Sequence, residues 1–329
     1  MKIIFNLQSC GLGNNGGSST IVKSANALVD LGHQVTILDS GKNQHSWTPL
    51  KADHIRGDPP DADAVIATGY KTVGRTLKLP DRCGVKYHWI RGWETWQMRE
   101  SEIHEKILKT PTIKLVNSIC LQKKLNSFGV ESTIIRPGHD FNQLFPTHQG
   151  HNRDCVVLGG LYNTRHNSKR TNWIFDAVRL FKFRYRVKLW MFGASSLQTN
   201  SDIVDEYVKN PAPGIKNEIY NGCDIWLAPT TNEGLHICPA EAMLTECPVV
   251  GTDAEMSGMQ DYLFDGVTGL VSSNDLNQFC KRIEYLIRFP DKRIKYGQAA
   301  RNQILSMGDR QSNMKKLVQL ISGSLYENI

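Results

Sequence analysis

Glu233 and Glu241 lie close together in a segment whose local structure can be predicted. The apolar run Ile225–Ala228 predicts a strand shortly before Glu233. Pro239 suits the first turn of a helix, because the N–H that proline lacks would have no helical partner there. We therefore expect a loop to carry Glu233 from the end of this strand to a short helix that contains Glu241.

The start of this helix could bind an anionic ligand. The backbone N–H groups of residues 235–238 would point out of the helix N-terminus, where they and the helix dipole favour phosphate. Carboxylates repel phosphate, so Glu233 and Glu241 would instead accept hydrogen bonds from sugar or ribose hydroxyls. An alternative stays open, because acidic residues are common at helix starts and both could simply be solvated.

Residues 233–252 resemble a sequence block of the retaining GT-B glycosyltransferases of family 4, also called glycosyl transferases group 1. Glu233 and Glu241 match the family's Glu-x7-Glu signature, and the residues between and after them agree almost position by position. Residues 261–271 are similar to the family's next block. The pair Thr245-Glu246 is a minor departure, because the family often has small residues there.

The resemblance implies roles for this block. Glu241 is expected to hold the ribose hydroxyls of a nucleotide, and Glu233 to contact hydroxyls of the donor sugar. The backbone at Leu235, His236 and Ile237 is expected to lie near the diphosphate and the sugar. This agrees with the argument from the helix N-terminus.

A basic cluster follows Gly159-Gly160, and the family has a Lys and an Arg in this region that clamp the donor diphosphate. Lys169 matches the family's Lys best. The Arg usually follows a strand-end glycine directly, where this chain has Gly160, so Arg165 or Arg170 would take its place. Fixed cations stabilise the charge of a departing diphosphate. The alternative is an ordinary solvated basic loop.

A glycine-rich turn at residues 13–19 resembles the family's Gly-Gly turn after the first strand. Gly16 and Gly17 are expected to face the donor phosphates, since a backbone without Cβ can approach a ligand closely. Gly11 also begins a G-x-G-x-x-G pattern, a weak signal of dinucleotide binding, with Asp39 as its ribose acid. A nicotinamide enzyme therefore stays open as an alternative.

Two further groups of residues have less specific patterns. The strand predicted for residues 85–90 leads to His88, Arg91 and Glu94, which we expect on the acceptor side, although His88 could be a satisfied core histidine. Residues 61–63 form a D-x-D motif, which is the metal site in glycosyltransferases of a different fold. Here it precedes a strand at its amino end, where ligands of such sheets do not bind. We expect no metal and no other cofactor.

Strands and helices alternate in both halves of the chain, which predicts two Rossmann-like α/β domains. The polar stretch 147–154 lacks apolar periodicity and predicts a linker. We expect an acceptor-side domain at residues 1–150 and a donor-binding domain at 151–309. The resemblance implies a GT-B fold, with doubly wound domains facing across a cleft and a final helix, about 310–329, packing back on the first domain.

The composition is that of a globular protein of 329 residues with a net charge of +7, which excludes a disordered or fibrous chain. The eight cysteines form no CxxC pair, and no signal peptide or membrane-spanning run is present, which predicts a cytoplasmic protein. A group of lysines could form solvated helix faces or a basic patch for peripheral contact with the cytoplasmic face of a membrane. These are Lys106, Lys109, Lys114, Lys123 and Lys124. No nucleic-acid-binding motif is present.

The sequence thus predicts a retaining, metal-independent glycosyltransferase that moves a sugar from a nucleotide-sugar donor to a hydroxyl of a saccharide or lipid-linked acceptor. Family analogy implies that the leaving phosphate takes the acceptor proton, so no general base is assigned. One alternative is a non-catalytic sugar-nucleotide-binding subunit, because the family's Arg is missing after Gly159. Others are a nucleotide-sugar epimerase and a glycogen-type phosphorylase, but no motif for a pyridoxal-phosphate lysine is apparent.

Overall fold

The computed structural model describes residues 1–13, 15–41, 48–147, 154–198, 200 and 202–326. The chain divides into two compact units, Met1–Gly138 with Asp309–Ile329, and His139–Gly308. Most of the predicted linker, residues 148–153, lies outside the described residues.

The second unit begins earlier than the boundary expected at residues 150 and 151. The segment before the polar stretch is already bonded to this unit. The N–H of Phe145 donates to Asn217 Oδ1 at 3.0 Å, and the N–H of Thr147 donates to Asn221 Oδ1 at 2.8 Å. The side chain of Leu144 is buried in the same core.

The first unit is built on a seven-stranded sheet in which every strand pair is parallel. Its strands are β1 Lys2–Asn6, β2 Gln34–Leu38, β3 Asp53–Ile55, β4 Ala64–Ala67, β5 Val85–Ile90, β6 Ile113–Val116 and β7 Thr133–Ile134. Their order is β3-β2-β1-β4-β5-β6-β7. Ile3 of β1 pairs with Val35 on one side and Ala64 on the other, so the strand order reverses at β1.

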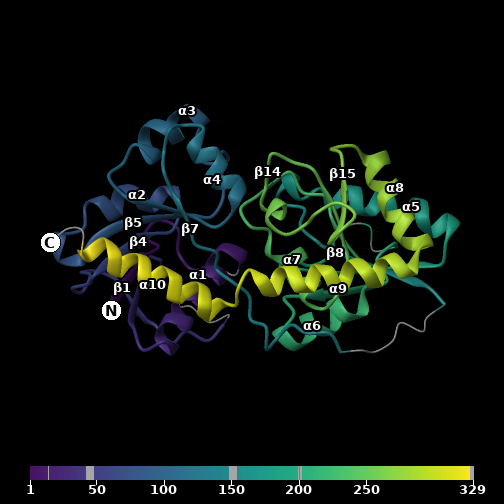
Figure 1. The fold of residues 1–329 in the computed structure, drawn as a ribbon, viewed down its shortest axis with the longest axis horizontal. Coiled ribbons are helices and arrows are strands. Elements are labelled where there is room, and N and C mark those ends of the chain that lie inside the picture. The colour runs from purple at the N-terminus through teal and green to yellow at the C-terminus, as the bar shows by residue number, and fades with distance from the viewer. Residues whose placement is uncertain (14, 42–47, 148–153, 199, 201, 327–329) are drawn as a thin grey trace. The chain divides into compact units, whose positions relative to one another are not determined.

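Helices cover this sheet, and one of them comes from the end of the chain. They are α1 Gly16–Asp30, α2 Tyr70–Leu77, α3 Glu100–Ile103, α4 Ile119–Asn126 and α10 Arg310–Tyr326. Figure 1 shows α10 in yellow beside α1, and its residues Met314, Leu317 and Ile321 are buried in the same core as β1. The last helix is therefore part of the first unit.

The second unit repeats the same strand order in a six-stranded parallel sheet, β10-β9-β8-β11-β13-β15. The strands are β8 Val156–Leu161, β9 Val187–Gly193, β10 Glu206–Lys209, β11 Ile225–Ala228, β13 Val249–Thr252 and β15 Gly269–Ser272. A separate two-stranded pair joins β12 Asn232–Glu233 to β14 Met256–Ser257. The helices are α5 Thr171–Arg184, α6 Pro213–Gly222, α7 Ile237–Leu244, α8 Leu276–Arg288 and α9 Pro290–Ser306.

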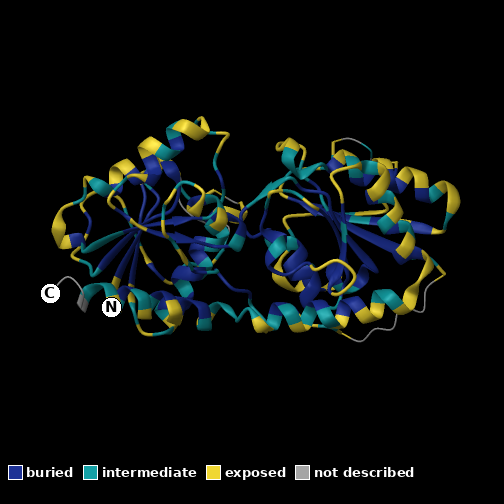
Figure 2. Ribbon diagram, turned by 45° about the horizontal axis from the view of Figure 1, so that its top comes forward, coloured by how far each residue is buried: buried dark blue, intermediate teal, exposed yellow. Residues whose placement is uncertain are grey.

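Burial follows the layered architecture. Figure 2 shows strands of both sheets in the dark blue of buried residues, whereas many outward helix faces are yellow. All four residues of β11 are buried, as expected of a parallel strand that is covered on both faces. None of the helices in the described part of the chain is long and apolar enough to cross a membrane.

Two local features depend on single residues. Helix α1 starts at Gly16, and its N-cap is Asn15, whose Oδ1 accepts the N–H of Ser18 at 2.9 Å. Strand β8 extends through Gly159 and Gly160. A Cβ on Gly159 would lie 2.5 Å from the Trp226 side chain, so glycine is needed inside this strand.

Candidate functional site

The donor-side residues predicted in the second half of the chain follow β8 and β11, where the strand order of the second sheet reverses, whereas Gly16 and Gly17 lie in α1 of the first unit. In doubly wound sheets, ligands bind at such a reversal point, beyond the carboxyl ends of the strands. The loop after β8 contains a short 3₁₀ turn, Asn167–Lys169, and the loop after β11 contains Glu233. The N–H of Thr231 donates to the carbonyl of Ser168 at 2.9 Å and joins the two loops.

This junction brings Lys169 and Glu233 together, although 63 other residues separate them in the sequence. The Lys169 ammonium forms an ion pair with Glu233 Oε1, and each side chain is only 18% exposed. Burial by itself raises the pKa of Glu233, but Lys169 and then His236 lower it, and the net pKa lies below its ordinary value. Glu233 is therefore held as a carboxylate.

The chain enters α7 through His236, which has a left-handed backbone with φ 58°. Such a conformation costs a non-glycine residue about 1–2 kcal/mol. Two hydrogen bonds stabilise it: Nδ1 lies 3.1 Å from Thr230 Oγ1, and the carbonyl accepts the hydroxyl of Tyr262 at 2.6 Å. Burial lowers the pKa of His236 to about 3, even though Glu233 raises it, so the ring is neutral at physiological pH.

The loop before α7 is held in place by a close backbone approach. Strand β12 pairs Glu233 with Ser257 of β14. A Cβ on the next residue, Gly258, would lie 1.8 Å from the carbonyl oxygen of Gly234. The buried side chain of Leu235 packs into the core below. The N-terminus of α7 at Ile237 is thus fixed relative to Glu233.

Glu241 lies in α7 with only 6% of its surface exposed. Its Oε2 accepts hydrogen bonds from two side chains of α6, Lys216 Nζ at 2.5 Å and Tyr220 OH at 2.9 Å. The sequence motif includes neither donor. The sequence does not point to them, because α6 has no motif and its residues do not predict a helix.

The two candidate arginines differ in what holds them. Arg170, with φ 48°, caps α5; its guanidinium lies 4.1 Å from the ring centre of Trp173 and donates to Asn274. Arg165 is exposed, and its N–H donates to Asn163 Oδ1 at 3.1 Å. Of the two, Arg165 has the side chain that can still turn toward a ligand.

The first unit has its own polar group at the carboxyl end of β5. Arg91 donates to the carbonyl of Gly17 at 2.5 Å and to that of Thr68 at 2.6 Å. It thereby joins the start of α1, where Gly16 is the first residue, to the loop after β4. Glu94 accepts the N–H of Tyr70 at 3.2 Å, and burial raises its pKa although this hydrogen bond and Arg91 oppose the rise.

His88, also expected on the acceptor side, lies within β5 and is fully buried. Neither ring nitrogen has a hydrogen-bond partner among the described residues, so it is a core histidine but not a satisfied one. Its ring lies 5.8 Å from that of Tyr70, edge to face. Burial, with smaller effects from Lys114 and Arg91, lowers its pKa to about 3.

The structure also locates the residues on which the metal-site and dinucleotide-binding hypotheses depend. Asp61 pairs with Arg82 at 3.2 Å, and Asp63 accepts the N–H of Lys2 at 2.8 Å, at the amino ends of β1 and β4. Asp39 accepts the N–H groups of Ser40 and Gly41 at 2.7 and 2.9 Å. Within the ranges that the structure describes, no three His, Cys, Asp or Glu side chains are grouped as metal ligands.

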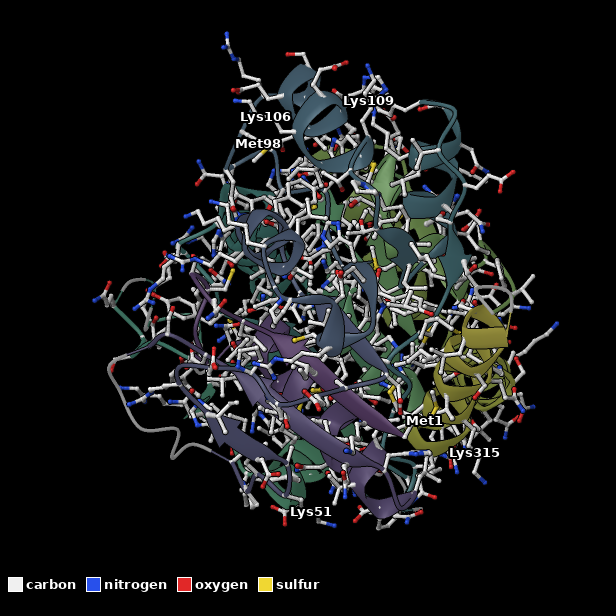
Figure 3. All side chains as sticks on the ribbon, turned by 90° about the vertical axis from the view of Figure 1, so that its left-hand side faces the viewer. Met1, Lys51, Met98, Lys106, Lys109 and Lys315 are labelled. Carbon is white, nitrogen blue, oxygen red and sulfur yellow. The ribbon has the colours of Figure 1, made fainter. Side chains whose placement is uncertain are left out.

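Most lysines of the expected basic patch are engaged with other groups. Lys106, Lys109 and Lys124 form ion pairs with Glu102, Glu105 and Glu100, respectively. Figure 3 shows Lys106 and Lys109 on the outer surface of the first unit. Lys114 is 5% exposed and donates to oxygens of Thr110 and Thr112; burial lowers its pKa to about 8. The net positive charge of this patch is therefore lower than its number of lysines suggests.

Comparisons with known proteins match part of the chain to a family model and the whole fold to solved structures. Residues 152–288 match the family model described as Glycosyl transferases group 1. No curated protein matches the chain. Among solved structures, the chain is similar to sucrose-phosphate synthase (tll1590) from Thermosynechococcus elongatus, with 14% identity, a TM-score of 0.81 and 100% of both chains covered.

Two other solved structures are similar over nearly the whole chain. The Anabaena Alr3699/HepE structure in complex with UDP and glucose matches with 14% identity and a TM-score of 0.79, covering 98% of this chain and 100% of that chain. The apo form of the lipopolysaccharide outer core galactosyltransferase WaaB matches with 14% identity and a TM-score of 0.70, with the same coverage. The chain has the GT-B fold, which confirms the predicted fold class.

Proposed function

We propose that this protein is a retaining glycosyltransferase that moves a sugar from a nucleotide-sugar donor to a hydroxyl of a saccharide or lipid-linked acceptor. The observation that carries the proposal is the half-buried ion pair of Lys169 with Glu233 beside the N-terminus of α7. The match of residues 152–288 to the group 1 glycosyltransferase model supports it, because this range contains the whole pair and all of α7.

In this proposal each part of the donor has a partner in the second unit. Glu233 accepts hydrogen bonds from the hydroxyls of the donor sugar, and Glu241 accepts those of the ribose. The N–H groups at the start of α7, near His236 and Ile237, bind the diphosphate. Lys169 lies between the carboxylate of Glu233 and the diphosphate. Arg165 supplies a second cation, because the guanidinium of Arg170 is held elsewhere.

The chemical step breaks the bond between the anomeric carbon and the diphosphate oxygen. The acceptor oxygen bonds to the same carbon from the same face, and the leaving phosphate takes the acceptor proton. We propose no general base and no metal ion. Lys169 and the α7 N-terminus stabilise the leaving diphosphate, which is where fixed positive charge accelerates such a reaction.

A turnover assay tests the proposal. A panel of nucleotide sugars is supplied with saccharide and lipid-linked acceptors, and release of the nucleoside diphosphate is measured together with the anomeric configuration of the product. Lys169→Met should lower kcat by about 10²–10³ because it removes one stabilising donor. Lys182→Met, which removes a cation paired with Asp205 elsewhere in the unit, is the matched control.

The alternatives give different products in the same assay. A non-catalytic binding subunit would bind nucleotide sugars but release no diphosphate. An epimerase would convert one nucleotide sugar into another with the diphosphate retained. A product of inverted configuration would refute the retaining mechanism and leave the transfer itself standing.

We also propose a cytoplasmic location, in keeping with eight cysteines that are all free thiols. Peripheral membrane contact stays a prediction that depends on a lipid-linked acceptor. Three of the five candidate lysines are ion-paired and Lys114 is buried, so we expect weak binding to anionic vesicles. Sedimentation with phosphatidylglycerol vesicles at low and high salt measures it; tight binding that resists salt would contradict this expectation.

A further inference from the structure

Two residues outside the signature motif hold the carboxylate of Glu241. Lys216 and Tyr220 are four positions apart in α6, so their side chains extend from the same face of that helix. Both donate to the same oxygen, Oε2, from Nζ at 2.5 Å and from the phenol at 2.9 Å. Two donors on one oxygen fix both the position and the plane of the carboxylate.

Both donors keep their protons at neutral pH. Burial by itself lowers the pKa of Lys216, but the Glu241 carboxylate more than reverses this effect, and the net pKa is raised. Burial raises the pKa of Tyr220, which is fully enclosed. The ammonium also lies 5.6 Å from the ring centre of Phe192 and 5.9 Å from that of Tyr220, at distances that favour a cation.

We propose that Lys216 and Tyr220 are positioning residues that set the orientation of Glu241 and so determine selectivity for ribose over 2′-deoxyribose. This inference rests on the proposed function, because it requires a nucleotide at Glu241. A buried site built to bind a hydroxyl rejects the ligand that lacks it, since its polar groups lose their partner. That rejection is strong only where the carboxylate cannot turn to find another partner.

The experiment compares affinities for UDP, ADP and GDP with those for their 2′-deoxy counterparts, measured by isothermal titration calorimetry. For the base that binds best, the wild type should prefer the ribose form by about tenfold or more, the value of one hydrogen bond to a charged group. Tyr220→Phe removes one hydroxyl and should reduce this preference severalfold. Lys216→Met should reduce it further.

The controls separate positioning from general damage. Lys182→Met breaks an ion pair of 2.7 Å in the same unit and should leave the preference unchanged. Glu241→Gln should abolish the preference, and adding Lys216→Met to it should then change nothing more. Because Tyr220→Phe keeps the ring and the charge, it serves as the test if Lys216→Met fails to fold.

The outcomes distinguish this inference from the proposed function. If the wild type binds no nucleoside diphosphate, the proposed function fails. If it binds one and Glu241→Gln removes the ribose preference, whereas Tyr220→Phe and Lys216→Met both retain it, the proposed function stands and the inference is overturned. A loss of affinity that is equal for both sugar forms would also overturn it, because a merely structural role predicts that result.

Discussion

Replacing Lys169 by Met tests the central ion pair without knowledge of the substrate. The variant removes the ammonium and leaves the Glu233 carboxylate with 18% of its side chain exposed. An exposed ion pair contributes about 0–1 kcal/mol, and truncating one partner of a fully buried pair costs about 3–5 kcal/mol. This pair lies between those limits, so we expect a loss of about 2 kcal/mol at pH 7. For a unit of this size that lowers Tm by about 4–8 °C.

The loss should depend on pH with a definite sign. In the wild type the folded pKa of Glu233 lies below its ordinary value of 4.5. The pair therefore adds stability above that pH, and this contribution is lost as the pH falls through the lowered pKa. Without Lys169, burial dominates and raises the folded pKa, so the carboxylate costs stability at pH 7 and the cost disappears on protonation. The Tm difference should be largest at pH 7 and shrink toward pH 4.

Thermal unfolding of the wild type, Lys169→Met, Glu233→Gln and the double variant between pH 4 and 8 measures these effects. Adding Lys169→Met to Glu233→Gln should produce a smaller loss that no longer varies with pH. Lys182→Met is the control for removing a lysine from the same unit. A Tm for Lys169→Met equal to that of the wild type, or a gap that stays constant between pH 4 and 7, would refute the reasoning.

Three further predictions concern binding, metal and the loop before α7. Glu241→Ala should weaken binding of the nucleoside diphosphate by about 1.5–3 kcal/mol in calorimetry, and unchanged affinity would reject the ribose assignment. Turnover should persist in excess chelator and in Asp61→Ala and Asp63→Ala, whereas loss in chelator with rescue by manganese would reopen D-x-D as a metal site. Gly258→Ala should displace Gly234, lower stability by about 1–3 kcal/mol and weaken diphosphate binding, as unfolding and calorimetry would show.

The sequence predicts the central strands because they are short, continuous apolar runs. Residues 85–90 and 225–228 form strands with the expected bounds. The edge strands β3 and β10 contain Asp53-His54 and Glu206, and neither has the apolar run of a buried strand. At a sheet edge one side lies open to water, so polar residues are tolerated and the pattern is lost.

The candidate site is predictable where backbone topology alone decides it. Lys169 and Glu233 follow β8 and β11, and adjacent parallel strands bring their following loops to one edge of the sheet. The contact of Lys216 with Glu241 depends instead on the packing of α6 against α7. Nothing in the local sequence of α6 shows which face turns toward α7, so this partner was found only in the structure.

The two lysine–glutamate pairs reduce a repulsion that the proposed donor site would otherwise create. A carboxylate beside a diphosphate should repel it, yet the proposed function places carboxylates that bind hydroxyls on both sides of the α7 N-terminus. Lys169 pairs with Glu233 before the helix, and Lys216 pairs with Glu241 within it. Each pair has no net charge, so the positive end of α7 is not cancelled by its neighbours. In the proposed function, the carboxylates accept hydrogen bonds from hydroxyl groups, and Lys169 and the N–H groups at the start of α7 attract the diphosphate.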